Sequence, residues 1–477
     1  MPSVRDQYHT DKASAANILP VNQKKHNISW PAWSCSRNLI GAPKEHREPK
    51  DFQDYLQTRD KSPRTIYILE GLAPSFTTIA NDYFGFHPSV LTDHHRLVAF
   101  SERATGEAGG LPFLPSSIRG RNHVSLKYHE ALKACPRPTC FRNLCDTTGR
   151  HIMATRISGA FSDVMIARRK CTVWSRKIEG GGWDCLIICD PPIRRIQTDD
   201  SGRRSFDVVA SPYNGGYPDF APHEDQAKTR SGPPLTSLLD DISFYICNHS
   251  ARLDLDNPLC AMTFIEKILA SHFMKVAEFV ESTMEKMQWN LSRRNDLSCF
   301  TAQGSEEQWS DVQAWQRRVG EFRSDLRGIM LQLRITPGDI ELDRLERMED
   351  NAVDYSFLHL RFTELGQLIA NVNGSIASLV GITGSRSALK AQEVSLEMTN
   401  LSVRDAKNMK ALTILGLIFI PFSYTASLFS MADNYSPGSG CFWVYFAVSF
   451  PLTGLSVLGY WILTHEGRSW GIKAFMK

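Results

Sequence analysis

Three cysteines and two histidines lie close enough in the sequence to suggest a metal site. Cys135, Cys140 and Cys145 follow His123 and His129, and thiolate and imidazole are the usual ligands of zinc. The four residues that separate successive cysteines are more than the two of the usual C-x-x-C pair of zinc-binding motifs. We therefore interpret these cysteines as free thiols, with a zinc site as the alternative.

No catalytic motif is visible in the sequence. The chain has no phosphate-binding P-loop, no dinucleotide-binding glycine fingerprint and no G-x-S-x-G nucleophile turn. His87, His94 and His95 lack the spacing of a metal-binding H-E-x-x-H helix. The 54 Lys and Arg nearly balance the 51 Asp and Glu, which gives no reason to expect nucleic acid as a partner. We expect a protein that is not an enzyme and has no resident cofactor.

The charges are distributed very unevenly along the chain. Charged residues make up 22% of the 477 residues, yet residues 411–464 contain only Asp433. Uncharged helices at 411–431 and 441–463 would be about 31 and 34 Å long, enough to cross the roughly 30 Å apolar core of a bilayer. The sequence therefore predicts two membrane-spanning helices, with a pair of buried core helices as the alternative.

The charges that flank the two spans predict their orientation. The flanking charged residues are Arg404, Asp405, Lys407 and Lys410 before the first span, and Glu466, Arg468, Lys473 and Lys477 after the second. Both sets are net positive, whereas Asp433 is the only charged residue of the connection at 432–440. Because Lys and Arg favour cytosolic flanks, both termini are expected in the cytosol. Without a visible leader or organelle signal, the plasma membrane is the default location.

The rest of the sequence predicts an α+β cytosolic domain. Residues 1–60 are polar and are interpreted as a tail. A domain at 61–240 contains two β-rich runs, 164–174 and 183–189, which a glycine turn joins into an expected hairpin. The stretch 190–237 is rich in Pro, Gly, Ser and charge and is interpreted as a surface insertion.

Helical patterns dominate residues 241–410. A stripe of apolar residues recurs every three or four positions between residues 365 and 379, and no proline occurs between 339 and 420. A helix beginning near Asp354 is therefore expected to continue as a stalk into the membrane, packed between subunits or against the chain's own helices. The predicted order ends with a transmembrane hairpin at 411–463 and a cytosolic tail at 464–477.

The first span contains a recognisable sequence motif. It begins Met409-Lys410, contains Phe419-Ile-Pro421 and ends Phe429-Ser-Met431. This sequence resembles the pore helix of the CorA family of divalent metal-ion transporters, whose members have a Met-Lys start, a Phe-x-Pro in mid-span and a terminal Gly-Met-Asn. The Phe-Ser-Met end, with the Pro-Gly and Phe-Trp pairs that follow it, is most similar to the CorA-like branch of filamentous fungi.

The resemblance implies a homopentamer in which five first spans line a pore for divalent cations such as Mg²⁺, with five second spans outside. The family's pore-facing positions fall on Met409, Leu412, Gly416, Ile420 and Ser423. Their spacings of three and four residues place them on one helix face independently of the family; the packing side of a two-helix hairpin is the alternative. Met409 and Leu412 would form a hydrophobic constriction, and Ser423 would offer a hydroxyl to a hydrated ion.

The outer end of the first span departs from the family pattern. The family's Gly-Met-Asn falls on Ser430, Met431 and Ala432, and alanine cannot contact the hydration shell of an ion as the family's asparagine does. Asp433 and Asn434 are the polar residues nearby, and five copies of Asp433 would attract cations. Two functions therefore stay open: a divalent-cation channel, or a non-conducting membrane-anchored structural or regulatory subunit that assembles with related chains.

One cytosolic acid also matches the family. The segment from Phe84 to Asp93 is similar to a family segment, in which the residue at Asp93 helps to bind a regulatory divalent ion between subunits. An aspartate beside His94, His95 and Arg96 also suits a solvated loop or a helix cap. A role of Asp93 in a solvated loop or as a helix cap is therefore the alternative to a role as a metal ligand.

Overall fold

The computed structural model describes residues 32–36, 44–59, 64–95, 122–140, 143–157, 159–179, 181–198, 204–221, 233, 237–293, 302–335, 350–430 and 440–474. The chain divides into two compact units, Met1–Val380 and Gly381–Lys477. The first unit is a mixed α/β structure, and the second is entirely helical in its described part.

The first unit is built on one large sheet, which has eleven strands within the described residues. The strands are β1 Ala32–Ser36, β2 Lys44–His46, β3 Arg64–Glu70, β4 His123–Cys135, β5 Asn143–Cys145, β6 His151–Ile157, β7 Ala160–Lys177, β8 Trp183–Cys189, β9 Arg195–Thr198, β10 Arg204–Asp207 and β11 Val209–Pro212. Their order is β10-β9-β5-β6-β7-β8-β3-β1-β2, while β4 pairs with β7 and β11. β3 and β8 are parallel, and the other described pairs are antiparallel.

β7 organises the sheet because three strands pair with it. β4 lies along one edge of β7, and β6 and β8 share the other edge, β6 toward the start and β8 toward the end of the strand. The predicted hairpin is confirmed as β7–β8. The interpretation of 190–237 as an insertion is wrong over β9, β10 and β11, because all three belong to the sheet. β9 pairs with β5 and β11 pairs with β4, both far earlier in the sequence, and β10 pairs with β9.

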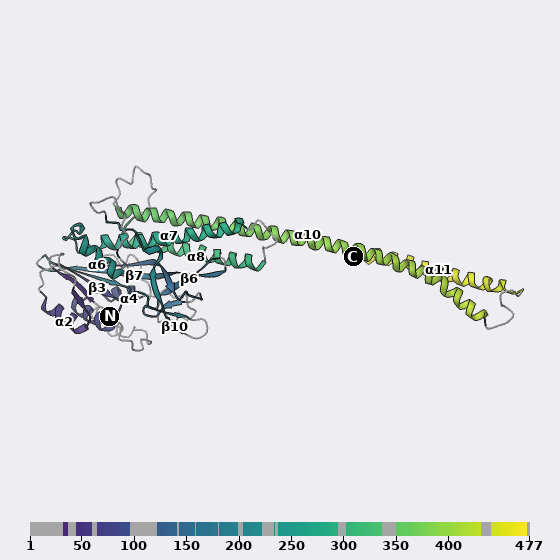
Figure 1. The fold of residues 1–477 in the computed structure, drawn as a ribbon, viewed down its shortest axis with the longest axis horizontal. Helices are drawn as coiled ribbons and strands as arrows, with labels where there is room; N and C mark the ends of the chain where they lie inside the picture. Colours follow the sequence, from purple (N-terminus) through teal and green to yellow (C-terminus); the bar gives the residue numbers. More distant parts are fainter. Residues whose placement is uncertain are drawn as a thin grey trace, which may run out of the picture. The chain divides into compact units, whose positions relative to one another are not determined.

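The two faces of the sheet bury alternate residues of its central strands, as the two-residue period of a β-strand requires. On β3, Tyr67 and Leu69 pack against α2 Pro49–Thr58, α3 Pro74–Phe84 and α4 Ser89–His95. Ile66 and Ile68 face the opposite side, which is covered by α6 Leu238–Asn248, α7 Met262–Arg293, α8 Ala302–Gln332 and the first part of α10 Asp350–Phe429 (Figure 1). Helices therefore cover the sheet on both faces.

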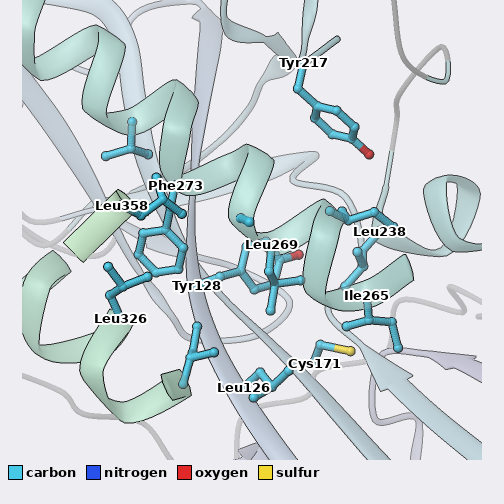
Figure 2. Close-up of a cluster of buried hydrophobic side chains, with 14 of the residues drawn as sticks. Leu126, Tyr128, Cys171, Tyr217, Leu238, Ile265, Leu269, Phe273, Leu326 and Leu358 are labelled. Atoms are coloured by element: carbon cyan, nitrogen blue, oxygen red, sulfur yellow. The ribbon is translucent and has the colours of Figure 1, made fainter. Parts of the chain in front are cut away.

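One hydrophobic core joins the sheet to the long helices. Figure 2 shows Leu126 of β4 below Phe273 of α7, Leu326 of α8 and Leu358 of α10, and all four side chains are buried. The predicted boundary at residue 240 therefore does not separate two domains. The apolar stripes of these helices are buried against the sheet, and the core they share continues along α10 to Ile376.

The interpretation of 1–60 as an irregular tail is wrong over its second half. β1 and β2 add to the sheet, and α2 lies on its face. Phe52 and Leu56 lie one helical turn apart and are 0% and 3% exposed. This small apolar stripe anchors α2, although the surrounding sequence is polar.

The second unit contains the end of α10 and α11 Trp443–Ala474. The prediction of an unbroken helix is confirmed, because α10 runs for 80 residues through Pro421 without interruption. α11 continues to Ala474, so the predicted tail at 464–477 is helical through most of its length. Both α10 and the part Trp443–Ile462 of α11 are long and apolar enough to cross a membrane.

Candidate functional site

The five predicted pore-facing residues lie on successive turns of α10 and are accessible in the single chain. Met409, Leu412 and Ile420 expose 66%, 66% and 70% of their surface. Ser423 is also exposed, and Gly416 is partly exposed. With about 100° of rotation per residue, the five positions fall within a sector of about 80°. We call these five residues the α10 stripe.

A different face of α10 contacts α11. Thr425 Oγ1 lies 2.7 Å from Ser449 Oγ, and both side chains are buried. Nearby, the Tyr445 hydroxyl donates a hydrogen bond of 3.3 Å to the carbonyl of Phe422. The rings of Tyr445 and Phe429 form an edge-to-face pair. Phe422, Thr425 and Phe429 therefore mark the side of α10 that packs against α11.

The α10 stripe and the α11-facing side lie on nearly opposite sides of the helix. The centre of the stripe and the centre of Phe422, Thr425 and Phe429 are about 150° apart at 100° per residue. The stripe is therefore not the packing side of the hairpin, which was the alternative that the sequence left open. Within this chain, the stripe is a face of α10 that points away from α11.

The stripe changes from apolar to polar along the helix. Its first part carries Met409 and Leu412, and its last part carries Ser423. The sequence prediction missed Ser427, which follows Ser423 by four residues and is exposed on the same face. Ser430, one further turn along, is exposed at the end of α10. The predicted outer-mouth residues Met431, Ala432, Asp433 and Asn434 lie outside the described residues.

Most of the apolar surface of both helices is uncovered in the single chain. Only 11% of the apolar window of α10 and 6% of that of α11 is buried. A pair of core helices in a soluble protein would bury these windows, so that alternative does not fit the described part of the chain. Surface of this kind requires lipid or other protein chains to cover it.

Asp93, the predicted regulatory ligand, lies in α4 and is bonded within the first unit. Its Oδ2 is 3.1 Å from Nε2 of His123, and the Lys170 ammonium donates to its backbone carbonyl. Among the described residues, no group of three or more His, Cys, Asp and Glu gathers as metal ligands would. A carboxylate held by an imidazole beside an ammonium group is not a site for a hard divalent cation by itself.

A buried network of charges supports the position of α4. Arg150 donates to the Asp190 carboxylate through Nε at 2.6 Å and Nη2 at 3.0 Å, and Arg150 also donates to the carbonyl of His94. Burial alone would raise the pKa of Asp190, but Arg150 and His94 lower it well below its ordinary value. Burial lowers the pKa of His94 to about 4 and the pKa of Lys170 to about 7. Asp190 is therefore the anion that balances these buried groups.

The cysteine and histidine cluster does not form a metal site among the described residues. Cys135 is exposed, and Cys140 and Cys145 are buried as free thiols. His129 Nε2 lies 2.8 Å from Asp325 on α8, and His123 is bonded to Asp93. None of these three cysteines forms a disulfide within the part of the chain that the structure describes. The histidines connect elements of the fold.

The fold and the site define a chain with a mixed α/β unit followed by two helices that are long and apolar enough to span a membrane. No protein-family model matches the sequence, and no curated protein matches it. Among solved structures, the chain is similar to the full-length CmaX protein, with 10% sequence identity over 93% of this chain and 99% of that chain and a TM-score of 0.32.

Proposed function

We propose that this protein is a CorA-like divalent-cation channel of the plasma membrane, with a pore lined by the α10 stripe. The observation that carries the proposal is the stripe itself, a face of α10 that is exposed and points away from α11. A helix with this arrangement can line a lumen while α11 lies outside. The sequence of the first span, which resembles the family's pore helix, also supports the proposal that α10 lines the pore.

The proposed assembly is a homopentamer with both termini in the cytosol. A single stripe cannot enclose a lumen, so several copies of α10 must surround a common axis. The net-positive flanks of both spans favour the cytosolic side. Lipid and neighbouring subunits would cover the remaining apolar surface of α10 and α11.

The chemistry of the stripe suits a hydrated cation. Met409 and Leu412 would form an apolar constriction that closes the pore when water leaves it. Beyond the constriction, Ser423 and Ser427 would present hydroxyl oxygens to the water shell of the ion. Mg²⁺ gives up its water reluctantly, so contact through the shell is the mode of recognition that we propose.

A second candidate function follows from the outer end of the first span. Ala432 stands where the family has the asparagine of Gly-Met-Asn, so the ion-contacting amide is missing. The second candidate is a non-conducting membrane-anchored subunit that assembles with conducting relatives. Changing Ser430 and Ala432 to Gly and Asn separates the two: transport gained from zero supports the second candidate, and transport by the unmodified protein excludes it.

The stripe assignment is tested by two matched substitutions. Leu412 and Leu415 are both exposed on α10, but Leu415 lies about 100° from the centre of the stripe. In liposomes, Leu412→Ala should widen the constriction and raise Mg²⁺ flux several-fold, whereas Leu415→Ala should leave it unchanged. Equal effects of the two substitutions would contradict the assignment.

A further inference from the structure

The charged residues of α10 avoid the α10 stripe, with one exception. The described segment from Gly381 to Phe429 contains eight charged residues. They are Arg386, Lys390, Glu393, Glu397, Arg404, Asp405, Lys407 and Lys410. Seven of the eight lie about 80° or more from the centre of the stripe, while Asp405 lies about 20° from it.

Asp405 extends the stripe by one helical turn before Met409. It precedes Met409 by four residues, so the two positions are on the same face and about 6 Å apart along the axis. The carboxylate is exposed. No described residue forms a hydrogen bond or an ion pair with it.

The basic residues next to Asp405 point elsewhere. Arg404, Lys407 and Lys410 lie about 120° to 180° from the centre of the stripe, on the side where α11 packs further along the helix. Opposite charges are therefore separated around the helix at this level. The acid shares the face of Met409, and the three bases share the other side.

We propose that Asp405 lines the inner entrance of the pore and concentrates divalent cations below the Met409 and Leu412 constriction. This inference rests on the proposed function, because only an assembly around a lumen brings several copies of Asp405 together. Carboxylate oxygens are preferred ligands of hard divalent cations, and a ring of acids raises the local cation concentration. The basic residues on the other side keep positive charge away from the ion path.

The test is Mg²⁺ flux into liposomes that contain the purified full-length oligomer. Asp405→Asn should raise the Mg²⁺ concentration for half-maximal flux by about tenfold, the lower end of the range for electrostatic focusing. Asp405→Glu should keep the half-maximal concentration close to that of the unmodified protein. The matched control is Glu397→Gln, which removes the same charge from an exposed position about 100° from the centre of the stripe and should change the half-maximal concentration less than about twofold. The effect of Asp405→Asn should shrink at high ionic strength because salt screens the charge.

The outcomes separate this inference from the proposed function. If the unmodified oligomer conducts and Asp405→Asn behaves like Glu397→Gln, the role of Asp405 is wrong and the channel is retained. If the unmodified oligomer does not conduct Mg²⁺, the proposed function is wrong and the role of Asp405 is wrong with it. Elution of each variant at the size of the unmodified oligomer shows that assembly is intact.

Discussion

Thr425 Oγ1 and Ser449 Oγ lie 2.7 Å apart between α10 and α11, with both side chains buried. This contact determines which side of α10 faces α11. Because helix geometry relates every other position to Thr425, the contact also places the α10 stripe on the side away from α11. The orientation of the proposed pore face therefore follows from this hydroxyl pair together with the contacts of Phe422 and Phe429 with Tyr445.

Removal of one hydroxyl from this pair should weaken the hairpin. Thr425→Val leaves Ser449 without its interhelical partner, and polar contacts of this kind between membrane helices contribute about 0.6 kcal/mol on average. A double-mutant cycle with Ser449→Ala measures the coupling energy between the two side chains, with thermal stability in detergent as the readout. Thr413→Val is the control, because Thr413 is exposed and bonds to its own helix. A coupling of zero would contradict the contact.

Cysteines introduced on the stripe should be accessible from water. Ser423→Cys lies on the stripe, whereas Ala426→Cys lies about 80° from its centre. A water-soluble thiol reagent should block Mg²⁺ flux through the first variant and spare the second. The unmodified protein is the reference for its own cysteines, which include the exposed Cys441. Equal block of both variants would place the ion path elsewhere.

Asp190 should be essential for the stability of the first unit. Asp190→Asn leaves Arg150 buried without its counter-charge, and breaking a buried ion pair in this way costs about 3–5 kcal/mol. The midpoint of urea unfolding, followed by tryptophan fluorescence, measures the loss. Asp207→Asn removes the same charge from the exposed Arg195–Asp207 pair and should leave the midpoint unchanged. Similar effects of both substitutions would contradict the role of burial.

Acid should destabilise the first unit through its buried histidines. His272 lies between the rings of Tyr128 and Tyr217, and burial lowers its pKa from the ordinary 6.5. Between 6.5 and the lowered value, the unfolded chain binds more protons than the folded chain, so the free energy of unfolding falls as the pH drops through this window. His272→Phe should reduce this dependence, measured by urea unfolding between pH 7 and 5. If the free energy of unfolding changed with pH as steeply in His272→Phe as in the unmodified protein, His272 would not be a source of the acid sensitivity.

The membrane helices could be predicted from the sequence because their signal is local. A long segment with one charge is visible without knowledge of the fold, and the spacing of Met409 to Ser423 places these residues on one face. The face that meets α11 could not be predicted, because it depends on Thr425 and Ser449 from different helices. From the sequence, Asp405 is only one of the charges that flank the first span.

The edges of the sheet were the least predictable part of the fold. β9 and β10 have four residues each, too few for an alternating pattern to stand out. Their stability comes from pairing, and β9 pairs with β5, which lies some fifty residues earlier in the sequence. The partner of Asp93 was hidden for the same reason, because His123 reaches it from β4.

Mg²⁺ flux into liposomes that contain the purified oligomer of known size tests the central claim most directly. With the interior held negative by a potassium gradient, we expect Mg²⁺ to enter at a rate well above that of empty liposomes. The rate should rise with the size of the potential, because a divalent ion gains about 4.6 kcal/mol in crossing 100 mV. A rate equal to that of empty liposomes, measured on an intact pentamer, would contradict the proposal that this protein conducts divalent cations.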